Sequence, residues 1–304
     1  MPSPSLKPFP IPLVAGPGSQ EDEAPGYLPM PQGMSTYQPP PLPEPEALAA
    51  HRGCVRVLEE ALAALRALAG AALPGAPTRT IDLAGLDPAD RRLLNQVLGE
   101  GEVAAQVLTV PGGAAADARV RVQESVFAGV WRVLHLDADG LVRGDRLEVG
   151  AVPQPLLDAA VEDGIRPAPV TEPAPEGVMN APSLLAELAE RRRLWKPGDA
   201  PHVINLTLLP LSAGDSEHLT RQIGEGRVLI LSRGYGNCRI VDTRWPRTWR
   251  VTYFNSTDMI ILDTLEVCRV PEVACASLED LEDSAERVAE VLEWVQDEER
   301  SRRG

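Results

Sequence analysis

Cysteine is the residue type with the most specific chemistry in this sequence, and most of it lies late in the chain. The sequence contains Cys54 and then Cys238, Cys268 and Cys275. Zinc and iron–sulfur sites need three or four soft ligands that converge, usually with closely spaced pairs among them. No two of these cysteines have the Cys-x-x-Cys spacing, so the pattern favours small buried hydrophobes. A transient metal or iron–sulfur site formed by Cys238, Cys268 and Cys275 stays open as the alternative.

Recognisable catalytic motifs are absent from the sequence. It has four histidines, and it contains no Gly-x-Ser-x-Gly, no His-Glu-x-x-His and no phosphate loop. His202 and His218 lack the i, i+4 spacing of a helical metal-binding pair. A pairing of Cys238 with His202 remains a thiol-enzyme hypothesis. The pattern as a whole favours a binding protein over an enzyme, with no catalytic residues and no resident cofactor expected.

A Gly-x-Gly phrase occurs twice, as LGEGEV at 98–103 and as IGEGRV at 223–228. A phosphate-binding loop places its glycines after a strand and before a helix, where backbone N–H groups point at the anion. Here the apolar periodicity of a helix comes before each phrase. We therefore expect Gly99 and Gly224 to end helices, in the left-handed conformation that glycine adopts at low cost.

These two phrases belong to a longer internal match. Gly99 and Gly224 are 125 residues apart, and the residues just before them match at the same offset. Further on, Trp131 and Trp249 match at an offset of 118. Similarity that keeps its order over about 75 residues indicates an internal duplication.

Each copy has the same expected order of elements. A short strand precedes a helix that Asp87 or Ser212 can cap, and three or four strands follow the glycine. Pro153 and Pro271 are expected to begin a final helix in each copy. The fold class is therefore α+β, with two tandem homologous units whose sheets are mainly antiparallel.

The rest of the chain is divided by composition. Residues 1–46 hold 14 of the 30 prolines, which favours an extended arm whose apolar residues pack on the body or on a partner. The expected domains are a proline-rich arm over 1–46, a helix over 47–70, a first unit over 79–160, a linker with a helix over 161–200, a second unit with a C-terminal acidic helix over 201–296 and a tail over 297–304.

Charge and hydropathy limit the partners. The formal net charge of -15 argues against nucleic acid, which requires a basic surface. No apolar run approaches the length of a membrane span, and the N-terminal residues do not resemble a secretory signal. We expect a cytoplasmic protein, with reduced cysteines and no membrane insertion.

The second copy carries polar residues that the first copy lacks, chiefly in SRGYGNC at 232–238 and YFNSTD at 253–258. Two copies share a core, so what differs is free to serve recognition, and loops on a rigid scaffold are where recognition usually occurs. The alternative is that the glycines only shape a tight hairpin. The candidate partner-binding residues are Arg233, Tyr235, Asn237, Cys238, Asn255 and Ser256.

Several phrases in the sequence carry a resemblance to a known family. YLPMPQGMSTY, GVMNAPSLLAEL, LSRGYGNCRI and YFNSTD, within a match from about Phe9 to Glu290, closely resemble the HupH/HyaF hydrogenase expression and formation proteins. The resemblance implies an accessory protein for maturing [NiFe] uptake hydrogenases. It implies that the partners are the iron–sulfur small subunit precursor, held with its twin-arginine signal peptide, and other hydrogenase accessory proteins. The alternative function is a metal or iron–sulfur handling factor that uses the thiols of the second copy.

Overall fold

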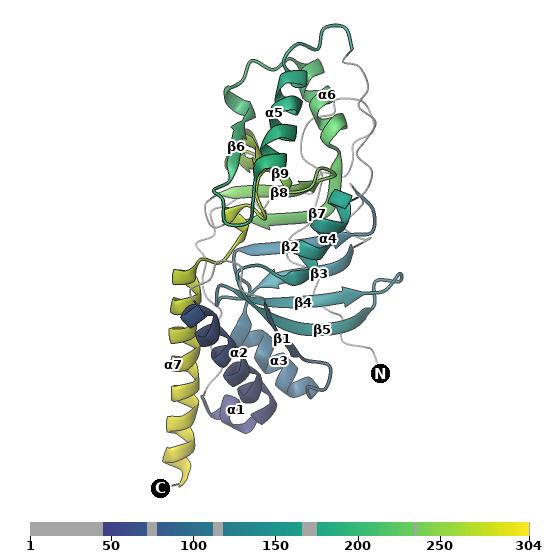
Figure 1. The fold of residues 1–304 in the computed structure, drawn as a ribbon. Coiled ribbons are helices and arrows are strands. Elements are labelled where there is room, and N and C mark those ends of the chain that lie inside the picture. The colour runs from purple at the N-terminus through teal and green to yellow at the C-terminus, as the bar shows by residue number, and fades with distance from the viewer. Residues whose placement is uncertain (1–44, 72–77, 112–117, 166–174, 234–235, 304) are drawn as a thin grey trace.

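The computed structural model describes residues 45–71, 78–111, 118–165, 175–233 and 236–303. Residues 1–44 of the proline-rich arm and Tyr235 therefore lie outside the described residues. Within that part of the chain, ten strands form one continuous antiparallel sheet with helices at both of its ends (Figure 1). The α+β class with tandem units is confirmed, and the two units share a single sheet.

The first unit follows the expected order. Asp87 caps its helix by accepting a hydrogen bond from the backbone N–H of Ala89 at 2.8 Å. The seven-residue change of offset falls in the connection between the second and third strands, which is longer here than in the second unit. The elements are β1 (Arg79–Asp82), α3 (Pro88–Leu98), β2 (Val103–Leu108), β3 (Ala118–Glu124), β4 (Val130–Leu136), β5 (Val142–Val149) and α4 (Gln154–Ile165).

The second unit has the same order but a different ending. Ser212 forms a reciprocal capping box with Asp215 at the start of its helix. Only a 3-10 turn follows Pro271, so the prediction that a final helix begins there is wrong. The elements are α5 (Ala181–Leu194), β6 (His202–Asn205), η2 (Leu206–Leu208), α6 (Ala213–Ile223), β7 (Glu225–Ser232), β8 (Asn237–Thr243), β9 (Thr248–Phe254), β10 (Ile260–Val267) and η3 (Glu272–Ala274).

Strand order in the sheet is symmetric about its centre. The order is β1-β5-β4-β3-β2-β7-β8-β9-β10-β6, so each unit contributes five strands and the second unit repeats the first in reverse. The joining strands β2 and β7 are antiparallel, with Val103 opposite Ser232 and Val107 opposite Val228. At the offset of 125, Ser232 is the counterpart of Val107 and Val228 that of Val103. The register therefore obeys a pseudo-two-fold axis between the two units.

Both tryptophans of the repeat occupy equivalent buried places. Trp131 and Trp249 are each 1% exposed and belong to one apolar cluster on the centre of the sheet, which α4 and η3 cover. Trp131 donates from its indole to Gly150 O at 2.8 Å, and Trp249 donates to Arg269 O at 3.2 Å. Two further apolar clusters pack at the ends of the sheet, one under α2 and α3 and the other under α5 and α6.

The glycine that ends each repeated helix has a positive φ, as expected, but not the ordinary left-handed ψ. Gly99 has φ 54 and ψ −153, and Gly224 has φ 63 and ψ 165. This region is essentially restricted to glycine. Each N–H still closes its helix, through Asn95 O and Thr220 O respectively.

Helix α5 is capped from another element rather than by its own Asn180. The Asn180 side chain makes no cap hydrogen bond and instead donates to Pro210 O at 2.8 Å. Asp215 of α6 accepts from the backbone N–H groups of Met179, Asn180 and Ala181. These bonds, with that to Ala181 the strongest influence, hold the pKa of Asp215 well below its usual range. The carboxylate thereby fastens α5 to α6.

The helices outside the repeated strands are longer or more divided than expected. The predicted helix over 47–70 is two helices, α1 (Pro45–Ala50) and α2 (Arg52–Ala71), with His51 between them. The C-terminal helix α7 (Leu278–Arg303) runs through the expected tail. It packs along α1 and α2 (Figure 1), and its buried residues there are Leu281, Ala285, Val288, Val291, Leu292 and Val295.

Candidate partner-binding site

The residues expected to contact a partner come to one edge of the sheet. Asn237 begins β8 and lies opposite Phe254 at the end of β9, so the hairpins that follow β7 and β9 are neighbours. Arg233 is exposed, and its backbone N–H donates to Glu102 O of the first unit at 3.1 Å. Ser256 is exposed at the second hairpin. Arg233, Asn237, Asn255 and Ser256 therefore share an edge, which we call the hairpin edge.

Asn255 has a structural task on this edge. Its side-chain oxygen accepts hydrogen bonds from Thr257 N at 2.9 Å, Thr257 Oγ1 at 2.8 Å and Met259 N at 2.9 Å. A short polar side chain that accepts several backbone N–H groups in this way fixes a turn. Because its oxygen is fully engaged, Asn255 shapes the hairpin rather than offering that oxygen to a partner.

The thiols lie in the core. Cys238 and Cys268 are 3% and 5% exposed, and both belong to the apolar cluster of the two tryptophans. Burial raises the pKa of the Cys238 thiol to about 12 and that of Cys275 to about 11, and it raises the pKa of Cys268 further. Since the thiolate is the nucleophile and the metal ligand, these side chains are held in their unreactive form. Cys238 does not contribute to the surface of the hairpin edge.

Among the described residues, no three His, Cys, Asp or Glu side chains are placed to hold a metal ion. None of the helices described has both the length and the apolar character that crossing a bilayer requires. His202 contacts Glu187 at 2.8 Å, a partner other than the Cys238 of the thiol-enzyme hypothesis.

A partly buried arginine–aspartate pair recurs in both units. In the first, Arg132 of β4 forms an ion pair with Asp145 of β5 and contacts Asn95 of α3. In the second, Arg250 donates to Asp263 through Nε at 3.0 Å and Nη2 at 2.7 Å, and it reaches Thr220 Oγ1 at 3.1 Å. The two arginines and the two aspartates correspond at the offset of 118, and Asn95 corresponds to Thr220 at the offset of 125. Each pair ties the helix of its unit to the sheet below it.

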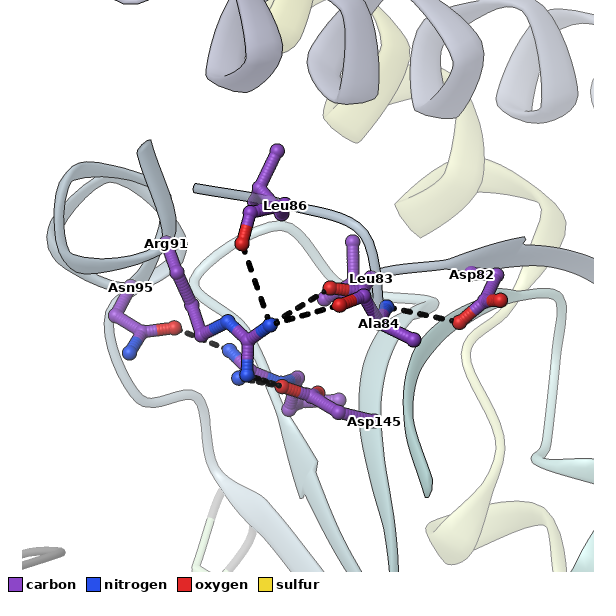
Figure 2. Close-up of polar contacts among 8 residues, drawn as sticks. Asp82, Leu83, Ala84, Leu86, Arg91, Asn95 and Asp145 are labelled. Carbon is purple, nitrogen blue, oxygen red and sulfur yellow. Dashed lines mark hydrogen bonds and ion pairs between the residues drawn. The ribbon is translucent and has the colours of Figure 1, made fainter. Parts of the chain in front are cut away.

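The first unit adds a second arginine to its pair. Figure 2 shows Arg91 of α3 extending toward Asp145 and toward the loop that follows β1. Its Nη2 donates to Leu83 O at 2.9 Å and to Leu86 O at 3.4 Å, and its Nη1 lies 3.3 Å from Asp145 Oδ2. One carboxylate and the loop carbonyls thus share a guanidinium that fills the space between α3 and the sheet.

The second unit leaves the same space open. The counterpart of Arg91 at the offset of 125 is Ser216, which is exposed on α6. Ser216 lines a pocket of about 260 Å³ between α6, the segment 206–211 and the sheet. Its polar lining is Ser216, Thr220, Thr207, Arg250 and Asp263, and leucine and isoleucine side chains form the remainder.

Exposed apolar side chains gather beside this pocket. Leu208 is 80% exposed and lies within the segment 206–211. Met259, Ile260 and Ile261 are also exposed at the start of β10, and Ile260 lines the pocket itself. Because Asn255 donates its backbone N–H to Met259 O, this patch continues into the hairpin edge. Adjacent exposed apolar residues of this kind typically mark an interaction surface.

The sequence pattern predicts the residues of the hairpin edge as candidates, but it does not predict the pocket. Its signal was already present in the aligned copies, since Ser216 stands where the first copy has Arg91. The loop between strand and helix is also two residues longer in the second copy, because Leu83 and Leu86 correspond to Leu206 and Leu211. A smaller side chain under a longer loop leaves a space, but an alignment of the two copies does not show where the longer loop lies.

Comparison with known proteins gives consistent results over nearly the whole chain. The chain is 49% identical over 289 residues to the hydrogenase expression/formation protein HoxQ of Cupriavidus necator, covering 94% of this chain and 98% of that one. It is 46% identical to HupH of Rhodobacter capsulatus, covering 93% and 97%. The hydrogenase-1 operon protein HyaF of Escherichia coli is 36% identical over 71% of this chain and 73% of its own.

A family model matches the chain twice, over residues 53–167 and 178–295. Each matched segment starts close to the helix before the first strand of a unit, α2 in the first and α5 in the second. The double match coincides with the symmetric halves of the sheet. The expected family is therefore confirmed: the chain belongs to the family described as HupH hydrogenase expression protein, C-terminal conserved region.

Proposed function

We propose that this protein is an accessory protein of [NiFe] uptake hydrogenase maturation that holds the iron–sulfur small subunit precursor in the cytoplasm before export. The names of its relatives, as hydrogenase expression/formation proteins, support the maturation role. The observation that carries the holding role is the asymmetry between the units. The first unit closes its helix–sheet space with Arg91, whereas the second leaves a pocket bordered by exposed apolar residues.

The chemistry of this surface suits a polypeptide. An apolar patch next to a pocket with a few polar groups gives a flexible chain both buried area and orientation. The net charge of -15 favours a partner with a basic segment, because complementary charge speeds encounter and sets orientation. The cysteine side chains of the described residues are buried or half-buried, so they add little to this surface.

The test is capture of a defined precursor. Tagged protein is co-expressed with the small subunit precursor or, separately, with the large subunit precursor, and the captured subunit is quantified by immunoblot. We expect capture of the small subunit precursor. Capture of the large subunit alone, or of neither, would contradict the proposal.

A matched pair of variants tests the hairpin edge in the same assay. Arg233→Ala removes an exposed cation from that edge, and we expect it to lower capture about fivefold, as truncation of a contributing interface residue does. Arg119→Ala is the control, because Arg119 is exposed on β3 at the position that corresponds to Asn237. Equal capture by both variants and the wild type would remove the hairpin edge from the binding surface.

A further inference from the structure

The pocket of the second unit has an occupied counterpart within the same molecule. In the first unit the corresponding space holds the guanidinium of Arg91, which contacts Asp145 and three loop carbonyls (Figure 2). The second unit keeps the acceptors but not the arginine. Asp263 corresponds to Asp145, and Ser216 replaces Arg91.

The acceptors of the second unit resemble those of the first, with one further donor, because Asp263 Oδ1 also accepts from Thr252 Oγ1 at 3.3 Å. Asp263 pairs with Arg250 as Asp145 pairs with Arg132. A carboxylate has about four lone-pair positions and often accepts more than one arginine, as Asp145 does here. Leu206 O accepts one backbone hydrogen bond, from Leu209 N at 3.2 Å, and its counterpart Leu83 O accepts one from Leu86 N at 3.1 Å in addition to that of Arg91.

The walls of the pocket suit the hydrocarbon part of a long basic side chain. Leu209, Leu211, Leu219 and Ile223 line it. Arginine packs its methylene groups against apolar surface while its charged head finds acceptors. Access is from solvent, because Ser216 is exposed on α6, and the exposed Leu208 and Ile260 stand beside the opening.

We propose that this pocket binds an arginine side chain of the partner polypeptide, with the guanidinium on Asp263 and the carbonyls of the segment 206–211. Arginine fits better than lysine because its planar fork of donors can serve a carboxylate and carbonyls together. The arm of this chain cannot supply it, since residues 1–44 contain a single basic residue, Lys7. The inference rests on the proposed function only for the identity of the polypeptide that carries the arginine.

The direct test uses a blocked pentapeptide, acetyl-Ala-Leu-Arg-Leu-Ala-amide, and the same peptide with citrulline in place of arginine. Citrulline keeps the shape and removes the charge. Binding is followed by amide shifts in ¹⁵N-labelled full-length protein. We expect the arginine peptide to shift the signals of Ser216, Thr220 and Asp263, and the citrulline peptide to bind about tenfold more weakly, as loss of a charged partner does. Equal shifts from both peptides, or shifts elsewhere only, would overturn the proposal.

A plugged variant provides the second test. Ser216→Arg places in α6 the residue that α3 has at the corresponding position, so it should fill the pocket from within and abolish the peptide-induced shifts. Ala213→Arg adds the same charge at an exposed position of the same helix and should leave the shifts unchanged. Peptide binding by Ser216→Arg at wild-type strength would contradict the inference. The wild-type peptide comparison stands even where the variant fails to fold.

The precursor assay separates this inference from the proposed function. Capture of the small subunit precursor by wild-type protein, with about tenfold less capture by Ser216→Arg, supports both. Capture that Ser216→Arg leaves unchanged rejects the pocket while the holding role stands. Absence of capture by the wild type rejects the holding role, and the peptide shifts then decide the pocket alone.

Discussion

Ala105 of β2 lies directly opposite Ile230 of β7, and these two residues are each other's counterparts in the repeat. A residue pairs with its own counterpart only where a two-fold axis passes between the strands. The pair therefore marks the centre of the ten-stranded sheet. It also shows that the two units pair through the same strand, so the arrangement is that of a symmetric dimer made within one chain.

Gly224→Ala should destabilise the protein by about 1–3 kcal/mol, because φ 63 with ψ 165 is a conformation that side chains rarely tolerate. A Cβ there would also lie 2.7 Å from Arg244 Cδ. Gly214→Ala, in the same helix, meets no atom closer than 3.7 Å, and it should stabilise by about 0.5 kcal/mol. Urea unfolding measures both, and changes of the same sign would refute the argument.

Trp131→Phe should lower the free energy of unfolding by about 1–3 kcal/mol, because it leaves the buried Gly150 carbonyl without its indole donor. Trp249→Phe removes the equivalent bond to Arg269 O, which is longer at 3.2 Å, and should cost less. Guanidinium unfolding monitored by circular dichroism tests the order of the two effects. A larger loss for Trp249→Phe would show that the two sites are not equivalent in strength.

Glu124 should make the protein less stable as pH rises toward neutrality. Burial raises its pKa from 4.5 to about 7, so between these values the unfolded chain releases a proton that the folded protein keeps. Stability is greatest below pH 4.5 for this group, falls through the interval and is lowest above pH 7, by up to about 3 kcal/mol.

Glu124→Gln isolates this contribution, since the amide oxygen can still accept from the Gly129 N–H, 3.2 Å from the carboxylate in the wild type. The variant should match the wild type at pH 4.5 and exceed its stability increasingly up to pH 8, as measured by urea unfolding at each pH. A constant difference across this range would mean that Glu124 does not titrate as described.

The four thiols should resist alkylation while the protein is folded. Burial raises the pKa of Cys54 and of Cys238 to about 12, and thiolate is the reactive form. A short pulse of iodoacetamide at pH 8, followed by peptide mass spectrometry, should label Cys275 first because it is the least buried of the four. Unfolding in urea should expose all of them. Rapid labelling of Cys238 in folded protein would revive the thiol-enzyme hypothesis.

Much of each unit could be predicted from the sequence because its signals are local. Asp87 and Ser212 cap helices through N–H groups two or three residues away, and the offsets place Trp131 and Trp249 correctly. Long-range choices were not accessible in this way. The cap of α5 comes from Asp215, 34 residues beyond Ala181. A local sequence pattern cannot predict a partner at that distance along the chain.

The ending of the second unit shows the same limit. Pro271 has the sequence context of Pro153, yet only a 3-10 turn follows it before α7 begins at Leu278 and packs along α1 and α2. The joining of two sheets into one was equally hidden, because the pairing of β2 with β7 depends on strand edges that meet across more than 100 residues. The pocket at Ser216 needed both the lost arginine and the position of the longer loop.

The pseudo-symmetric pairing of β2 with β7 has a consequence for the substitutions that the two halves can accept. In a dimer of two identical chains, every substitution appears on both sides, so a residue that fills a space in one half fills it in the other. With both halves encoded in one chain, Arg91 can stabilise one end while Ser216 leaves the other open. Covalent linkage of the halves thus permits one end to be closed and the other to stay open, a difference that exact symmetry forbids.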